Sequence, residues 1–250
     1  MSGHNKWSTI KRKKGATDAK RGQIFTRLAK EITMAAREGG GDPNANFRLR
    51  LALEKARSNN MPKDSIDRAI NRGTGVGKDT EQFEEIMYEG YGPKGIALII
   101  NCVTENRNRT ISDLRHTLTK AGGNMADMGS VAWQFTRGAF FEIAAKNVDF
   151  DTVFELAVEV GAEDVESDGD SISISAPVEV FKELSEKLRA GNYTIQEAGM
   201  RYTPNQETEL GVEDTMQVMR CIEALEDLDD VQNVYSNMSI SDEVLASLEN

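Results

Sequence analysis

The sequence contains little of the side-chain chemistry that metal centres and nucleophilic active sites need. It has two cysteines, Cys102 and Cys221, and two histidines, His4 and His116. Zinc sites and nucleophile–base pairs draw mainly on these residue types, and their spacing here fits neither kind of site. We therefore predict no catalytic residues, no metal ion or other cofactor, and no small-molecule substrate. His116 falls within an expected helix, where we expect it to cap or pack.

Long apolar runs are also missing. No run of about 18 or more apolar residues occurs, so we expect no membrane-spanning helix and no membrane partner. The segment Met1 to Lys14 is polar and basic and lacks the apolar centre of a secretory signal. Two cysteines far apart in sequence suit a reducing compartment. Together these features predict a cytoplasmic protein.

Positive charge is scarce overall but is concentrated at the N-terminus. The chain has 30 Lys and Arg against 41 Asp and Glu, a formal net charge of −11. Residues 1–78 contain 18 Lys and Arg against 7 Asp and Glu, a net charge of +11, whereas residues 79–250 contain 12 against 34, a net charge of −22. A polyanion would be attracted to the first part and repelled by the second.

Residues 1–78 are predicted to form a basic helical domain with a flexible N-terminal tail. Apolar side chains recur at three- and four-residue spacing in three segments, which indicates amphipathic helices over 18–37, 46–59 and 62–72. Asn46 is a good N-cap for the second of these helices.

The segment Gly73 to Asp79 has some resemblance to a phosphate-binding loop. However, three residues rather than four separate its outer glycines, and Asp79 stands where Ser or Thr is needed. A flexible linker is the better interpretation of this glycine-rich segment.

After the linker, the pattern changes to strands and helices. Residues 138–204 are predicted to form an inserted domain with the β-α-β-β-α-β order of ferredoxin-like folds. Its elements are strands over 139–144, 164–166, 171–175 and 194–202, and helices over 150–160 and 178–190. The flanking residues 79–137 and 205–250 are predicted to form one discontinuous α+β domain, with strands over 85–91, 96–103, 130–135 and 231–237 and helices over 108–121 and 212–225. The predicted fold class is thus α+β with three domains, an N-terminal helical domain and two α+β domains, one inserted into the other.

Basic side chains are dense at the start of the chain, with an aromatic ring among them. Lys and Arg neutralise phosphates and release counterions, and Trp7 can stack on an exposed base. The alternative is a solvated tail whose Trp7 packs on the first helices. On the first interpretation, the nucleic-acid-binding residues here are His4, Lys6, Trp7, Lys11, Arg12, Lys13, Lys14, Lys20 and Arg21.

Two further groups of charges are candidates for a site. Arg48, Arg50 and Arg57 project from the polar face of the second helix and suit phosphates. Arg107 and Arg109 stand at a helix start, which is unfavourable for the helix dipole, so either a ligand or simple exposure explains them. A third group, Asp227, Asp229 and Asp230, offers a divalent-ion site or an exposed acidic loop, and we expect the loop.

Several short motifs occur in a fixed order over nearly the whole chain. They are Gly3-His-Asn-Lys-Trp7, Asp18-Ala-Lys-Arg-Gly22, Gly39-Gly-Gly-Asp-Pro43, Asn59-Asn-Met-Pro62, Tyr88-Glu-Gly-Tyr-Gly-Pro93, Asn106-Arg-Asn-Arg-Thr110 and Asp227-Leu-Asp-Asp-Val231. In this order they resemble the YebC family, which includes bacterial regulators and the mitochondrial translational activator of cytochrome oxidase. The resemblance implies three domains around a cleft and a non-enzymatic action on gene expression, through either DNA binding or the ribosome.

The residues themselves favour one nucleic-acid partner over the other. The second helix shows no array of side chains for reading base edges, and the acidic remainder would be repelled by a long duplex. A ribosome presents RNA phosphates beside basic proteins, so ribosomal RNA is favoured modestly over promoter DNA. A third hypothesis is a protein–protein scaffold that acts through the acidic α+β domains.

Overall fold

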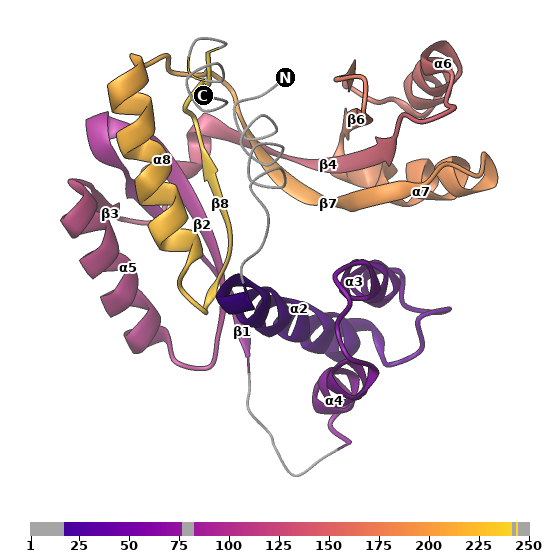
Figure 1. The fold of residues 1–250 in the computed structure, drawn as a ribbon, viewed down its shortest axis with the longest axis horizontal. Coiled ribbons are helices and arrows are strands. Elements are labelled where there is room, and N and C mark those ends of the chain that lie inside the picture. Colours follow the sequence, from indigo (N-terminus) through magenta and orange to yellow (C-terminus); the bar gives the residue numbers. More distant parts are fainter. Residues whose placement is uncertain (1–17, 77–82, 242–243, 245–250) are drawn as a thin grey trace. The chain divides into compact units, whose positions relative to one another are not determined.

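A computed structural model describes residues 18–76, 83–241 and 244 of the 250-residue chain (Figure 1). They divide into two compact units: Phe135–Pro204, and the residues on either side of that segment. Among the described residues, no helix is both long and apolar enough to cross a bilayer.

Residues 18–76, the first described part of the larger unit, form three helices. They are α2 (Asp18–Gly39), α3 (Phe47–Ser58) and α4 (Lys63–Gly73), close to the predicted bounds. Their apolar stripes meet in one core that includes Ile32, Leu49 and Ile66. Asn46 caps α3 as predicted, because its Oδ1 accepts a hydrogen bond from the Leu49 N–H at 3.0 Å.

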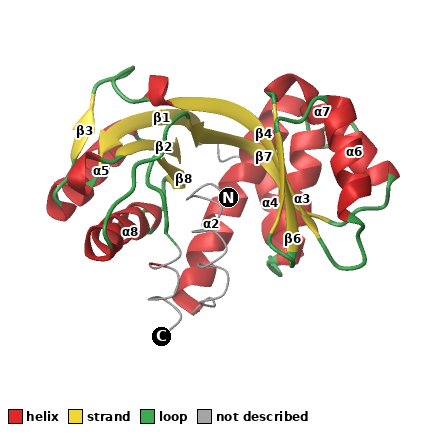
Figure 2. Ribbon diagram, turned by 90° about the horizontal axis from the view of Figure 1, so that it is seen from above, coloured by secondary structure: helices red, strands yellow, loops and turns green. Residues whose placement is uncertain are grey.

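The rest of the larger unit is a four-stranded antiparallel sheet with two helices on one face (Figure 2). The strand order is β3-β1-β2-β8. The apolar sides of the helices pack on the sheet in a core that includes Ile100, Leu114 and Ile222. The elements are β1 (Glu84–Tyr91), β2 (Ala97–Thr104), α5 (Arg107–Ala121), β3 (Asn124–Ala126), α8 (Val212–Glu226) and β8 (Val231–Ser236).

The predicted strand over 130–135 is wrong. The fourth strand of this sheet is β3, which pairs with β1, and residues 130–134 form a turn and the short helix η2 (Ala132–Gln134). The physical reason is the buried carboxylate of Glu89, which accepts hydrogen bonds from the N–H groups of Gly129, Val131 and Ala132 at 2.7, 2.5 and 2.8 Å. These N–H groups are therefore unavailable to a strand ladder.

The unit Phe135–Pro204 has the ferredoxin-like order that the sequence predicts. Its sheet is antiparallel, with strand order β5-β6-β4-β7. Phe135 pairs with Pro204, so the unit begins and ends on neighbouring strands, as an insertion into another chain segment requires. The elements are β4 (Phe135–Ala144), α6 (Phe150–Val160), β5 (Asp164–Ser167), β6 (Ser171–Ala176), η3 (Val178–Val180), α7 (Phe181–Ala190) and β7 (Ile195–Pro204).

Candidate nucleic-acid interface and the Asp230 cluster

The predicted binding residues fall into three groups. Lys20 and Arg21 belong to α2, close to its N-terminus. Arg48, Arg50 and Arg57 belong to α3, and Arg107 and Arg109 open α5. The remaining predicted contacts lie outside the described residues: His4, Lys6, Trp7, Lys11, Arg12, Lys13 and Lys14.

The three arginines of α3 have different environments. Arg48 forms ion pairs with Glu38, at 2.6 Å, and with Glu85. The guanidinium of Arg50 lies over the ring of Phe47, 5.4 Å from its centroid. Arg57 is exposed and forms no ion pair with any described residue. Of the three, Arg57 is therefore the one whose charge is open to a phosphate.

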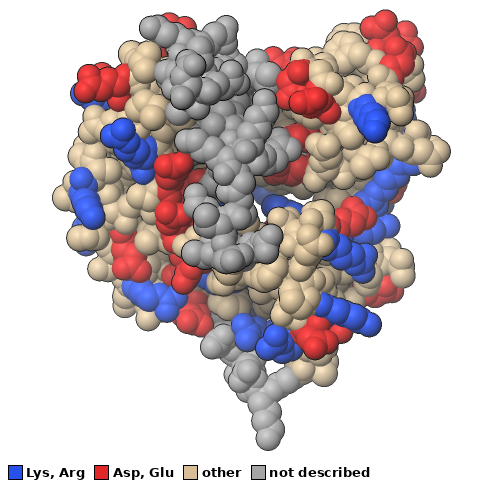
Figure 3. All heavy atoms as spheres, viewed as in Figure 1, with Lys and Arg blue, Asp and Glu red and all other residues tan. Residues whose placement is uncertain are grey.

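Other exposed basic side chains lie on α4, at Lys63, Arg68 and Arg72. Over residues 22–76 the sequence has 10 Lys and Arg against 6 Asp and Glu, so this region is weakly positive. In Figure 3, Lys and Arg side chains are interspersed with Asp and Glu over α3 and α4. Residues 22–76 thus contribute +4 of the net charge of +11 that residues 1–78 carry, and the greater part of this net charge comes from residues 1–21 and 77–78.

Arg107 and Arg109 both pair with carboxylates. Arg107 pairs with Glu84 of β1. Arg109 donates from one guanidinium nitrogen to both carboxylate oxygens of Asp230, at 3.0 and 3.1 Å, and also pairs with Glu105 at 3.4 Å. These anions offset the unfavourable position of the two arginines at the helix start. Simple exposure, one of the two explanations considered for these arginines, therefore holds only in part, because each guanidinium already has an anionic partner.

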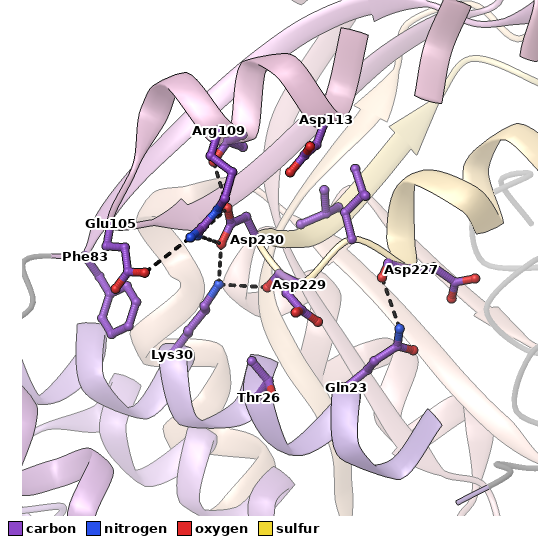
Figure 4. A pocket seen from close by; sticks show the side chains of 13 residues that line it. Gln23, Thr26, Lys30, Phe83, Glu105, Arg109, Asp113, Asp227, Asp229 and Asp230 are labelled. Atoms are coloured by element: carbon purple, nitrogen blue, oxygen red, sulfur yellow. Dashed lines mark hydrogen bonds and ion pairs between the residues drawn. The ribbon is translucent and has the colours of Figure 1, made fainter. Parts of the chain in front are cut away.

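Asp230 is the centre of a buried polar cluster that joins α2 to the sheet (Figure 4). Lys30 donates to the Asp230 carboxylate at 2.7 Å and to the Asp229 carbonyl oxygen at 2.8 Å. The hydroxyls of Thr110 and Thr104 donate to the same carboxylate at 2.8 and 3.2 Å. Lys30 and Asp230 are 7% and 6% exposed, so this ion pair is shielded from water.

The cluster keeps Asp230 ionised. Burial alone would raise the pKa of the Asp230 carboxyl group, but hydrogen bonds from Lys30, Thr110 and Arg109 outweigh burial and lower that pKa below its ordinary value. The prediction of an exposed acidic loop is therefore wrong for Asp230, although Asp227 and Asp229 are exposed. The physical reason is that Asp230 directly precedes β8, where its side chain meets cations from two helices.

A polar cavity of about 660 Å³ adjoins this cluster. Its basic side chains, Lys30 and Arg109, are both paired with Asp230. Asp113, Asp227 and Asp229 line the remainder and pair with no cation among the described residues, so these residues do not make the cavity attractive to a phosphate. Within the described residues, no three His, Cys, Asp or Glu side chains are arranged to hold a metal ion.

The ferredoxin-like sheet differs from the sheets of this topology that bind RNA. Those sheets offer exposed aromatic rings on their central strands for base stacking. On the central strand β4, Phe140 is 3% exposed, and the guanidinium of Arg201 lies 3.2 Å from its ring centroid. Residues 135–204 also contain 14 Asp and Glu against 6 Lys and Arg. This unit therefore lacks a stacking platform and is repulsive to polyanions.

The two cysteines are buried, whereas His116 is exposed. Burial raises the pKa of the Cys102 thiol to about 12 and that of the Cys221 thiol to about 11, so both remain protonated at neutral pH. The expectation for His116 is wrong: its side chain is exposed on α5, whose N-cap is Asn106 and whose C-cap is Gly122.

The chain belongs to the TACO1/YebC family. Residues 5–76 match the model of the family's N-terminal domain, and residues 83–238 match that of its second and third domains. A relative from Geobacter sulfurreducens, named probable transcriptional regulatory protein, is 46% identical over 99% of this chain and 100% of its own length. A relative of the same name from Chlorobaculum parvum is 47% identical over 100% of this chain and 99% of its own.

A solved structure supports the same fold. It is that of a conserved hypothetical protein from Aquifex aeolicus, which has a TM-score of 0.83 and 41% sequence identity to this chain. The similarity covers 91% of this chain and 94% of the other.

Proposed function

We propose that the protein is a non-enzymatic, cytoplasmic regulator of gene expression that binds nucleic acid through its basic N-terminal tail and Arg57. The observation that carries the proposal is the division of charge, +11 over residues 1–78 and −22 over residues 79–250. Phosphate attraction at one end and repulsion elsewhere would orient the protein on a polyanion. The names of the relatives, probable transcriptional regulatory proteins, agree with a regulatory role.

The described residues support an assignment of roles within this interface. Arg48, Arg50, Arg107 and Arg109 already have carboxylate or aromatic partners, so we assign them mainly structural roles. Of the predicted binding residues, Arg57, the tail, and Lys20 and Arg21 at the start of α2 are left as the phosphate contacts. On this proposal residues 1–78 act as the binding domain, and the α+β domains 79–137 with 205–250 and 138–204 act away from the phosphates.

The nucleic acid is either promoter DNA or ribosomal RNA. The names of the relatives favour DNA, whereas two properties of this chain favour RNA next to basic proteins. One is the acidic remainder, which a long duplex would repel. The other is that two of the three arginines on α3 are held by neighbouring side chains, which leaves no array for base edges. Crosslinking in cells, followed by sequencing of both RNA and DNA, decides between the two targets.

Binding itself is tested with a tail variant and a variant matched in charge. The tail variant changes Lys11, Arg12, Lys13 and Lys14 to Ala. The control changes four exposed cations outside residues 1–78 to Ala, namely Lys120, Lys146, Lys182 and Arg220. Both lose the same number of charges, so they differ only in where the charge is lost.

Affinity is measured by fluorescence anisotropy with labelled RNA and DNA duplexes at fixed salt. We expect the tail variant to bind more weakly on every sequence, by at least about tenfold, and the control variant to change by less than about threefold. Equal losses in the two variants would show that the overall charge of the chain, and not the tail, sets the affinity.

A further inference from the structure

Helix α6 of the inserted unit is apolar on two opposite sides. Val153, Ala157 and Val160 point into the core of the unit and are buried. Phe150, Phe154 and Val158 recur every four residues on the outer side and are 36%, 45% and 51% exposed. The described residues include six exposed large apolar side chains, and these three are half of them. Because the three lie on one side of one helix, they form a stripe, whereas single exposed apolar side chains are ordinary on protein surfaces.

The outer stripe is not needed to form the helix. Asp149 caps α6, since its carboxylate accepts hydrogen bonds from the Thr152 N–H at 3.1 Å and from the Thr152 hydroxyl at 2.6 Å. Gly161 ends the helix in the left-handed conformation at φ 93°. Since caps and the inner core face account for the helix, its outer apolar side chains are available to a partner.

The segment of the chain that contains the stripe carries negative charge only. Residues 147–181 contain ten Asp and Glu and no Lys or Arg. Glu159 pairs with Lys187 of α7 at 3.1 Å. Asp151 and Glu155, which alternate with the stripe along the helix, are exposed and have no cationic partner among the described residues.

The negative charge beside the stripe indicates which kind of partner can bind there. A nucleic acid or an anionic membrane surface would be repelled by Asp151 and Glu155. A second copy of α6 packed about a two-fold axis would bring acidic side chains against their own copies. A protein segment that carries apolar side chains between Lys or Arg satisfies both the stripe and its acidic rim.

We infer that α6 is a docking helix for a basic protein, whose apolar side chains contact Phe150, Phe154 and Val158 and whose cations pair with Asp151 and Glu155. This surface goes beyond the proposed nucleic-acid binding and lies on a different part of the chain. On this inference the unit Phe135–Pro204 binds a basic protein, whereas the N-terminal tail binds phosphates.

A photo-crosslinking amino acid at position 154 of the full-length chain tests the docking helix in cells. The expected result is one discrete protein partner whose crosslinked peptide is rich in Lys and Arg. The double variant Asp151→Lys with Glu155→Lys should reduce this crosslink by at least about fivefold, the change that about 1 kcal/mol produces. The control position is Lys182 on α7, which is exposed but lies outside the stripe.

Several outcomes overturn the inference. They are a yield at position 154 no higher than at 182, a crosslink to a second copy of the chain or to nucleic acid, and a partner peptide without basic residues. A yield that survives the double charge reversal overturns it as well. The tail variant is run in parallel, and its position-154 crosslink should be unchanged, so failure of nucleic-acid binding and failure of docking are separate results.

A synthetic amphipathic helix of Leu and Lys provides the test with purified protein. The wild type should bind it, and Phe154→Ser with Val158→Ser should weaken binding by at least about fivefold. Circular dichroism of this variant checks that α6 remains folded. Equal binding by wild type and variant, or equal binding of a peptide with Glu in place of Lys, contradicts the inference.

Discussion

The ammonium group of Lys30 lies 2.7 Å from the carboxylate of Asp230, although 200 residues separate the two in the chain. The pair fixes α2 against the start of β8, and Gln23 adds a second link by donating to the Asp227 carbonyl oxygen at 3.1 Å. The helical part that bears the proposed interface is therefore held to the sheet by buried charge rather than by apolar packing alone.

The first prediction concerns this pair. Asp230→Asn should lower the free energy of unfolding by about 3 kcal/mol, because Lys30 is left buried without an anion. Asp229→Asn is the matched control, since its side chain is exposed and only its carbonyl oxygen accepts from Lys30. Urea denaturation followed by circular dichroism measures both. Equal losses in the two variants would mean that the buried pair contributes nothing specific.

Sequence pattern was sufficient for the helices and most strands, but not for the role of Asp230. Helix periodicity and the cap residue Asn46 are local signals, and the predicted bounds of α3 and α6 lie close to the observed ones. Asp230 and Glu89 look like surface carboxylates in the sequence. Their burial depends on Lys30 and on the N–H groups of residues 129–132, which lie far away in the chain, so no local pattern reveals it.

The second prediction concerns acid stability. Burial alone would raise the pKa of Glu89, but hydrogen bonds from the N–H groups of Gly129, Val131 and Ala132 lower it below its ordinary value of 4.5. A carboxyl group with a lowered pKa in the folded state stabilises the protein above its unfolded pKa. This stabilisation is lost as the pH falls through the folded pKa. The loss of stability between neutral pH and about pH 3 should therefore be smaller in Glu89→Gln.

The fluorescence of Trp133 reports on unfolding near Glu89, because Trp133 directly follows the residues whose N–H groups donate to the Glu89 carboxylate. Trp7 is the other tryptophan in the chain, so a Trp7→Phe background isolates the Trp133 signal. Urea midpoints are compared at the two pH values with and without Glu89→Gln. An identical pH dependence in both proteins would show that the Glu89 carboxylate does not couple protonation to folding.

The third prediction separates binding from structure among the arginines. Arg57→Ala should weaken nucleic-acid binding by about threefold with no change in stability, because its exposed charge has no partner among the described residues. Arg109→Ala should lower stability by about 1 kcal/mol, because a partly exposed cation of Asp230 is removed, and should leave affinity nearly unchanged. Anisotropy titrations and urea unfolding on both variants give the four values, and the reverse pattern would refute this division of roles.

The most direct measurement of the central claim is the dependence of nucleic-acid affinity on salt. If the tail and Arg57 together contact about five phosphates, the logarithm of the association constant should fall with the logarithm of salt concentration at a slope of about −3.5 for a single strand and about −4.5 for a DNA duplex. Changing Lys11, Arg12, Lys13 and Lys14 to Ala should bring the slope to within about 2 of zero, whereas the charge-matched control should keep the wild-type slope. A wild-type slope near zero, or a tail variant with an unchanged slope, would contradict a phosphate-binding tail.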